Sequence, residues 1–432
     1  MIQPNHHNAM PGPARFARSF IAQLLLTVLF GVAVPTLLIG RIWFENADDF
    51  LLQPSSVITI AGAAIAVTMA VIILRKFAAY PGMPELSYIL PVHIGTFGVI
   101  ATTILLARLP YSAAFLSITF LATLFVTFAF TSLLRRSRAT QYRLVAGGKV
   151  GRLTDLPGFS YEVLDQPVLP FQDEVAIVAD LHHDHSAEWE RLLAEAALQS
   201  MPVYHYKQVY EAFTGMVQIE HLSENSLGSL LPSRSYTSVK QLFDILFCAI
   251  ALPLMAVPLL LTAIAIKIES RGPVFFRQLR IGYRGQPFRV IKFRTMRPAL
   301  EEKLGVREAA ITRANDVRIT KLGRFLRRTR IDELPQIINI LRGEMSLIGP
   351  RPEAIALSEW YQQELPFYDY RHIVRPGITG WAQINQGHVT DIEAIDAKLQ
   401  YDFFYIKNFS YWLDILISIR TLAVILSGFG AK

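Results

Sequence analysis

The 432-residue sequence has a single cysteine, Cys248, and only 18% charged residues. One cysteine cannot build a disulfide framework or a cysteine-based zinc site within the chain, so both are excluded. The scarcity of charge is matched by 52% hydrophobic residues and a mean hydropathy of +0.33, which is too apolar for an ordinary soluble protein. We therefore expect a membrane protein.

Four apolar stretches in residues 1–140 are each long enough to cross about 30 Å of hydrocarbon. They cover Phe20 to Ile39, Val57 to Leu74, Ser87 to Leu106 and Ala113 to Leu134. Arg75 and Arg135 follow the second and fourth stretches, and the positive-inside rule places these ends in the cytoplasm. The pattern predicts a bundle of four transmembrane helices.

Residues 141–235 instead have the pattern of a small soluble α/β domain. The expected strands and helix are Tyr142 to Ala146, Val175 to Ala179, Val203 to Tyr206 and, for the helix, Ala187 to Gln199. Gly147, Gly148 and Gly151 follow the first strand without the spacing of a dinucleotide-binding loop, which favours an interaction or regulatory domain.

Three histidines of this domain, His182, His183 and His185, cluster in one expected loop with Asp184. A metal site would need a further ligand at a suitable spacing, and none stands at helical spacing from them. We interpret the cluster as a solvated loop.

The charge of the chain is divided unevenly along its length. Residues 271–351 hold 19 Lys and Arg against 7 Asp and Glu, whereas residues 141–232 hold 5 against 13. So dense a basic block is suited to phosphate, from a nucleotide, a lipid head group or a nucleic acid. Nucleic acid is the weakest of the three because the block adjoins an apolar run and contains no recognisable nucleic-acid module.

That apolar run, Ile245 to Ile266, has positive charge at both ends and contains Pro253 and Pro258. A straight crossing would place the whole basic block outside the cell, contrary to the positive-inside tendency. A re-entrant helix over about residues 240–268, broken at Pro258, avoids this because prolines bend helices. A kinked transmembrane helix is the alternative.

A β-hairpin is expected next, with strands Val274 to Gln278 and Phe288 to Met296. Alternation along the second strand places Lys292 and Arg294 on one face, where two cations could bind a phosphate. A solvated strand face is the simpler alternative.

The acidic pair Asp332-Glu333 stands at the start of a predicted helix, with Pro335 in its first turn and Gly343 at its end. A helix N-terminus favours ionised carboxylates, so both should be anionic at neutral pH. With Arg327 among the neighbouring arginines, the pair could serve simply as a helix cap with surface ion pairs. It would also suit phosphoryl chemistry, with one carboxylate as nucleophile and the other as a metal ligand.

Two rigid loops and a terminal helix complete the basic region. Arg351 lies between two prolines, which suits a fixed phosphate contact. The Gly-rich segment Arg375 to Asn385 could hold a nucleotide or a sugar. The segment Tyr401 to Phe429 mixes apolar and charged residues and is expected to lie in the membrane interface.

Together these segments closely resemble the bacterial sugar transferase family, the polyprenyl-phosphate hexose-1-phosphate transferases, over about Ser238 to Lys432. The matching motifs are Lys-Gln-Leu-Phe-Asp244, Gly272-Pro-Val-Phe-Phe-Arg-Gln278, Lys292-Phe-Arg-Thr-Met296, Asp332-Glu-Leu-Pro-Gln336, Met345-Ser-Leu-Ile-Gly-Pro-Arg-Pro352 and Arg375-Pro-Gly-Ile-Thr-Gly380. The four spans and middle domain look like those of the family's long members. The resemblance implies an α/β catalytic domain over residues 236–432, anchored at the cytoplasmic face of the bacterial inner membrane by a re-entrant helix and interfacial helices.

The resemblance also implies a reaction. Asp332 would attack the β-phosphate of a UDP-sugar, releasing UMP, and Glu333 would hold Mg²⁺. A polyprenyl (undecaprenyl) phosphate would then take the phosphosugar from the enzyme, while Lys292, Arg327 and Arg351 steady the phosphoryl oxygens. Homo-oligomers and glycan-assembly partners are further expectations, and the sugar is not indicated.

Two departures from the family pattern are present. Val257 precedes Pro258 where the family has serine, and Ile384-Asn-Gln-Gly-His388 replaces Val-Asn-Gly-Arg. Two other functions stay open: a one-step transfer in which Asp332 is only a base or metal ligand, and a non-catalytic scaffold that binds anionic lipid and assembly partners.

Overall fold

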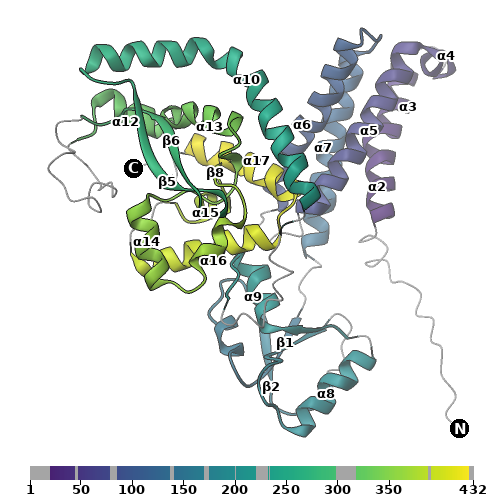
Figure 1. The fold of residues 1–432 in the computed structure, drawn as a ribbon. Helices are drawn as coiled ribbons and strands as arrows, with labels where there is room; N and C mark the ends of the chain where they lie inside the picture. The colour runs from purple at the N-terminus through teal and green to yellow at the C-terminus, as the bar shows by residue number, and fades with distance from the viewer. Residues whose placement is uncertain are drawn as a thin grey trace, which may run out of the picture. The chain divides into compact units, whose positions relative to one another are not determined.

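A computed structural model of the chain describes residues 20–43, 47–77, 85–136, 141–169, 175–199, 201–219, 232, 234–297, 318–387 and 391–427. It forms two compact units, Met1–Phe213 and Thr214–Lys432 (Figure 1). The second unit thus begins ahead of the predicted boundary at 236. The predicted division into 1–140, 141–235 and 236–432 stays a prediction. His388 lies outside the described residues.

The first unit begins with apolar helices, which cover the four predicted stretches. They are α2 (Phe20–Val28), the π-helical turn η1 (Leu29–Ala33), α3 (Val34–Trp43), α4 (Ala47–Leu52), α5 (Pro54–Phe77), α6 (Glu85–Leu106) and α7 (Ala113–Arg136). The continuous α2–η1–α3 segment and the helices α5, α6 and α7 are each long and apolar enough to cross a membrane. Val32, Val67, Phe97 and Leu116, one from each, share a hydrophobic core. These helices fit the predicted membrane protein, whereas the short α4 was not predicted.

A four-stranded parallel sheet follows in the same unit. Its elements are β1 (Gln141–Val145), the turn η2 (Val150–Leu153), β2 (Tyr161–Leu164), β3 (Val175–Ala179), α8 (Ala187–Leu198), β4 (Val203–His205) and α9 (Tyr206–Thr214). The strand order is β2-β1-β3-β4, and every residue of β3 is buried, as expected of a central parallel strand. The α/β domain is confirmed, but β2 and α9 were missed. Tyr206, predicted as the end of a strand, begins α9.

The second unit is an α/β fold with one very long helix. Its elements are α10 (Arg234–Glu269), β5 (Phe275–Ile281), η4 (Tyr283–Gly285), β6 (Pro287–Phe293), α12 (Lys321–Arg328), η6 (Ile331–Gln336), α13 (Ile337–Leu341), β7 (Ser346–Ile348), α14 (Ile355–Glu364), η7 (Tyr368–Ile373), β8 (Gly377–Thr379), α15 (Trp381–Asn385), α16 (Ile392–Lys407) and α17 (Tyr411–Ser427). Strands β5 and β6 form the predicted antiparallel hairpin, and β7 pairs with β8 in parallel.

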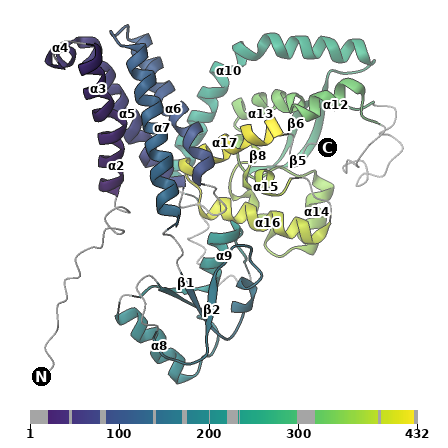
Figure 2. The same cartoon turned by 180° about the vertical axis from the view of Figure 1, so that it is seen from behind.

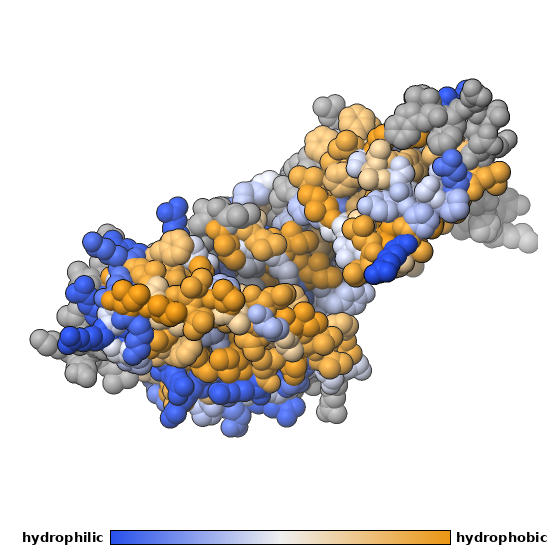
Figure 3. Space-filling model, turned by 90° about the horizontal axis from the view of Figure 1, so that it is seen from above, coloured by the Kyte–Doolittle hydropathy of each residue, from blue (hydrophilic) through white to orange (hydrophobic). Residues whose placement is uncertain are grey.

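Helix α10 continues through both prolines and bends visibly along its length (Figure 1). Ahead of Pro253 and Pro258, Cys248 packs in one hydrophobic cluster with Val290 and Ile340 of the α/β fold. After the two prolines, Ile266 packs with Phe293 and Leu326 of the same fold. The opposite side of the helix is apolar and exposed, and Figure 3 shows it as a broad hydrophobic face.

The terminal segment differs from the single interfacial helix that the sequence predicts. It is divided into α16 and α17, which Figure 2 shows as separate helices. Phe403 and Tyr405 of α16 are buried, so this part belongs to the core of the unit. Leu422 of α17 is 65% exposed, so only the later part has an apolar surface suited to an interface.

Candidate active site

The acidic pair lies in the short 3₁₀ helix η6, directly ahead of α13. The chain turns into η6 at Arg330, which has left-handed backbone angles (φ 59°, ψ 15°). Pro335 is inside η6, and Gly343 follows α13 with φ 75°, where a residue with a side chain would be strained. The pair therefore stands at a helix start as predicted, but in a tighter turn and buried: Asp332 is 8% and Glu333 4% exposed.

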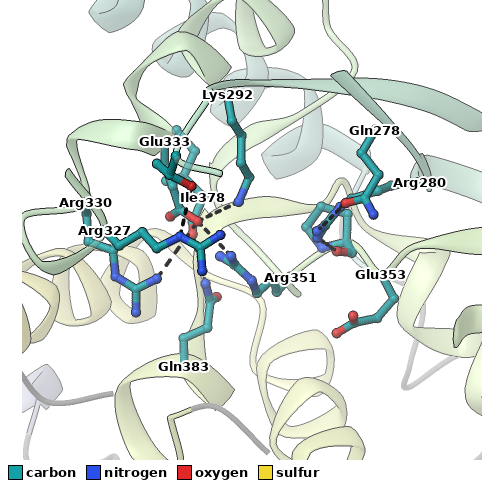
Figure 4. A network of polar contacts seen from close by, with 12 residues as sticks. Gln278, Arg280, Lys292, Arg327, Arg330, Glu333, Arg351, Glu353, Ile378 and Gln383 are labelled. Carbon is teal, nitrogen blue, oxygen red and sulfur yellow. Dashed lines mark hydrogen bonds and ion pairs between the residues drawn. The ribbon is translucent and has the colours of Figure 1, made fainter. Parts of the chain in front are cut away.

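Glu333 is held by three cations (Figure 4). Its Oε1 lies 2.8 Å from Lys292 Nζ of β6, 2.7 Å from Arg351 Nη2 and 3.9 Å from Arg330 Nη1. Burial by itself would raise the pKa of Glu333, but Arg351 and Lys292 outweigh it and hold that pKa well below its usual value. Glu333 is therefore a fixed anion, and the structure brings Lys292 and Arg351 to it.

Asp332 is in a different electrostatic state. Its Oδ1 is buried and has no hydrogen-bond partner within the part of the chain that the structure describes. Burial and the neighbouring Glu333 charge raise the pKa of Asp332 to about 6, although Lys292, Arg327 and Arg351 oppose that rise. Asp332 is therefore still mostly ionised at pH 7, as predicted for both carboxylates, but by a narrow margin.

Lys292 and Arg327 complete the positive surroundings of the pair. Burial lowers the pKa of Lys292 to about 8, even with Glu333 beside it. Arg327 of α12 donates from Nε to Thr295 Oγ1 at 2.9 Å, and its charge acts on Asp332. Two carboxylates and several cations thus share one buried site, an arrangement that can stabilise a transferring phosphoryl group.

The structure gives two predicted site residues other partners. The strand ends at Phe293, and the guanidinium of Arg294 donates through Nη2 to the Ser270 carbonyl at 2.7 Å and the Ser270 hydroxyl at 2.8 Å. Arg375 donates from Nε to the Gly343 carbonyl at 3.1 Å and stacks on the Tyr283 ring. Both contacts hold backbone segments in place, so phosphate binding by Arg294 or Arg375 stays a prediction.

Gln383 of α15 was missed by the sequence analysis, although it lies in the predicted Gly-rich loop. Its side chain points toward the arginines of the site (Figure 4). Its Nε2 donates to the Ile378 carbonyl at 2.9 Å, while its buried Oε1 has no hydrogen-bond partner among the residues described. Only the fold shows that this amide faces the acidic pair.

His182, His183 and His185 lie in a loop, with His182 and His183 exposed as predicted, but His182 also belongs to a cluster with Asp180 and His205. His182 Nδ1 lies 2.7 Å from His205 Nε2, and Asp180 Oδ1 lies 3.5 Å from the same nitrogen. These three groups are close enough to hold a metal ion. However, the Lys207 N–H donates to His205 Nδ1 at 3.0 Å, so a neutral His205 carries its own proton on Nε2, where the metal would bind. The cluster is therefore better described as a hydrogen-bond chain.

The fold and the site define a class: a membrane-associated enzyme with a buried, cation-ringed carboxylate pair. Residues 235–428 match the bacterial sugar transferase family. The chain is 44% identical over 375 residues to the UDP-N-acetylgalactosamine-undecaprenyl-phosphate N-acetylgalactosaminephosphotransferase of Aeromonas hydrophila, covering 87% of this chain and 88% of that protein. The chain belongs to the bacterial sugar transferase family.

Other relatives match a shorter part of the chain. The UDP-glucose:undecaprenyl-phosphate glucose-1-phosphate transferase of Escherichia coli K12 is 45% identical over 188 residues, which is 43% of this chain and 39% of that protein. The glucose-1-phosphate transferase of Caulobacter vibrioides is 41% identical over 202 residues, 46% of this chain and 74% of that protein.

Proposed function

We propose that this enzyme transfers the sugar 1-phosphate of a UDP-sugar to undecaprenyl phosphate, releasing UMP and forming an undecaprenyl-diphospho-sugar. The product would begin assembly of an exopolysaccharide or O-antigen type glycan. The observation that carries the proposal is the acidic pair itself, in which Asp332, whose Oδ1 has no hydrogen-bond partner among the described residues, adjoins the cation-bound Glu333. The names of the compared relatives support the two substrates.

The reaction would proceed through two displacements at one phosphorus atom. A carboxylate oxygen of Asp332 attacks the β-phosphorus, the bond to the bridging oxygen breaks, and UMP leaves with the electron pair. An oxygen of the lipid phosphate then attacks the same phosphorus, and Asp332 leaves as a carboxylate. Lys292, Arg327 and Arg351 would face the charged phosphoryl oxygens, and ping-pong kinetics follow from the covalent intermediate.

Mg²⁺ is the cofactor that this donor set fits. Carboxylate oxygens are the ligands that Mg²⁺ prefers. The buried Asp332 Oδ1 has no hydrogen-bond partner among the described residues, so the site holds a carboxylate oxygen that is available to a cation. Oε1 of Glu333 is already bound by Lys292 and Arg351, so Glu333 would hold the ion through its other oxygen. The ion would supply further neutralisation of phosphate charge.

We further propose that α10 is re-entrant, with its break at Pro258 and the catalytic unit on the cytoplasmic face of the inner membrane. The support is that Cys248 and Ile266, on either side of Pro253 and Pro258, pack against one and the same fold. A helix crossing the bilayer would put these residues at opposite sides. Single cysteines at Thr237→Cys and Arg271→Cys, in a Cys248→Ala background, should both be labelled from the cytoplasm, and labelling from opposite sides would rule out re-entry.

The first donor to test is UDP-N-acetylgalactosamine, because the Aeromonas relative covers most of this chain. Purified enzyme with this donor, Mg²⁺ and undecaprenyl phosphate should release UMP and move sugar label into the lipid fraction. Asp332→Asn should abolish both, whereas Glu364→Gln, which changes an exposed carboxylate of the same unit, should not. Full activity of Asp332→Asn would show that Asp332 is not the nucleophile, whereas no activity of the unmodified chain with any donor would support the non-catalytic scaffold. UDP-glucose and UDP-galactose complete the panel.

A further inference from the structure

The backbone of the loop that carries Arg351 is bound by a guanidinium group that has no role in the proposed reaction. Arg371 of η7 is only 3% exposed. Its Nε and Nη2 donate to Asp402 Oδ2 of α16 at 3.1 and 2.8 Å, and Nη1 donates to the Tyr368 hydroxyl at 2.8 Å. Nη2 also donates to the Arg351 carbonyl at 2.8 Å. One side chain thus ties the backbone of Arg351 to a buried carboxylate.

The next carbonyl of the loop is bound by a second guanidinium group. Arg280 of β5 donates from Nη1 to the Pro352 carbonyl, and its Nε and Nη2 donate to Gln278 Oε1 at 3.1 and 2.9 Å. Figure 4 shows Gln278 and Arg280 beside Arg351 but away from Glu333. Two consecutive carbonyls are therefore bound by guanidinium groups that come from different elements.

Glu353, directly after these carbonyls, adds a third anchor. It contacts Lys398 of α16, and its backbone carbonyl accepts from the Ile281 N–H at 3.2 Å. Burial would raise the pKa of Glu353, but the charges of Lys398, Arg371 and Arg280 lower it to about 2. The Glu353 side chain thus stays ionised, and keeps its contact with Lys398, at every pH at which the enzyme would work.

We propose that Arg371, oriented by Asp402, is a positioning residue that fixes the backbone of Arg351 and thereby aims the Arg351 guanidinium at Glu333 and the reacting phosphate. Proline on both sides of Arg351 restricts the loop, so the carbonyl contact controls the direction of the side chain. A planar guanidinium is required because it bonds the Asp402 carboxylate and the Arg351 carbonyl at once, which an ammonium group cannot do with the same geometry. The inference rests on the proposed function, which assigns Arg351 to the phosphoryl oxygens.

The test is the rate of UMP release by Arg371→Lys. This variant keeps the positive charge but loses the planar guanidinium that bonds Asp402 and the Arg351 carbonyl together. A misplaced Arg351 should lower kcat by about 10- to 100-fold, because small displacements of a catalytic group have effects of that order. KM for the UDP-sugar should change by less than about threefold, and the thermal midpoint should stay within a few degrees. Asp402→Asn should act in the same direction, and Asp396→Asn on the same helix, whose carboxylate bonds Gln400, should retain full activity.

A double-mutant cycle separates positioning from general stabilisation. If Arg371 acts through Arg351, adding Arg371→Lys to Arg351→Gln should lower the rate by no more than about twofold further. UMP release is followed over hours with a radiolabelled donor, so that the rates of slow variants can be measured. A further loss equal to that of the single Arg371→Lys variant would overturn the inference and leave the proposed function intact. No UMP release by the unmodified enzyme would overturn both.

Discussion

Two buried aspartates, one in each unit, have pKa values shifted in opposite directions. Asp180, at the end of β3, is 6% exposed and accepts from the Lys149 N–H at 2.9 Å and the His182 N–H at 3.2 Å. Burial by itself would raise its pKa, but these N–H groups and the nearby histidines lower it. Asp332 is 8% exposed, its Oδ1 has no hydrogen-bond partner among the residues that the structure describes, and its pKa is raised. Both side chains are nearly closed to solvent, so their neighbours separate them: N–H donors and histidines lower the pKa of Asp180, whereas the Glu333 charge adds to the rise at Asp332.

The comparison separates a carboxylate that stabilises a fold from one that can react. A carboxylate whose lone pairs are all engaged is a poor nucleophile, because attack would first break favourable bonds. A buried carboxylate without such bonds is costly to maintain, and such groups concentrate at functional sites. The following predictions are ordered from the largest expected effect to the smallest.

Asp332→Asn should remove at least about 10³-fold of the transfer rate, because the amide cannot form the acyl phosphate. The same substitution should leave the thermal midpoint unchanged or raise it, since it removes a desolvated charge next to Glu333. Rates come from UMP release and midpoints from a thermal melt in detergent. A variant that is both inactive and strongly destabilised would break the comparison, because Asp332 would then be a structural residue.

Lys292→Met should lower the rate by about 10²-fold, because Glu333 loses the ammonium 2.8 Å from its Oε1 and the phosphate loses a cation. Arg277→Met, at an exposed position of the neighbouring strand β5, serves as the control. Equal rates for the two variants would show that the cations around Glu333 do not act on the reaction.

The pH dependence should report Asp332 directly. Because its pKa is raised to about 6, the nucleophile is protonated below that pH, and kcat/KM should fall about tenfold per pH unit there. An unshifted aspartate would keep nearly full activity down to about pH 5. The profile is measured with UMP release from pH 4.5 to 8.

Asp180→Asn should have the smallest effect on catalysis and act on stability instead. The variant loses the charge of the carboxylate that accepts from the backbone N–H groups of Lys149 and His182. This loss should cost about 1–3 kcal/mol of the free energy of unfolding of the sheet domain. The folded-state pKa of Asp180 is depressed, so its stabilisation is present above the unfolded value of 3.8 and is lost as the pH falls further. Melts at pH 7 and pH 3.5 check this, because the variant and the unmodified chain should differ less at the lower pH.

The elements that the sequence could predict are those with strong local patterns. The apolar helices, the buried strand Val175–Ala179 and the β5–β6 hairpin follow from hydropathy and turn residues. Lys292 and Arg351 could be associated with the acidic pair because they lie in distinctive motifs. The short strand β2 has an exposed pattern and no such periodicity, so it was missed.

The rest depended on tertiary contacts, which local patterns do not contain. Arg294 was paired with Lys292 by strand alternation, but the strand ends at Phe293 and Ser270 takes the guanidinium. The bond between Arg371 and Asp402 joins residues 31 positions apart, and nothing in either local sequence indicates the other. The same holds for His205, which reaches Asp180 and His182 only through the parallel sheet.

The central claim is that Asp332 becomes covalently bonded to the phosphosugar. Enzyme is mixed with UDP-N-acetylgalactosamine and Mg²⁺ without undecaprenyl phosphate, quenched within milliseconds to seconds, digested and examined by mass spectrometry. The account predicts a burst of one UMP per enzyme and a phosphosugar on the peptide that contains Asp332. No burst and no adduct, from enzyme that turns over when the lipid acceptor is added, would contradict the account and favour transfer in one step.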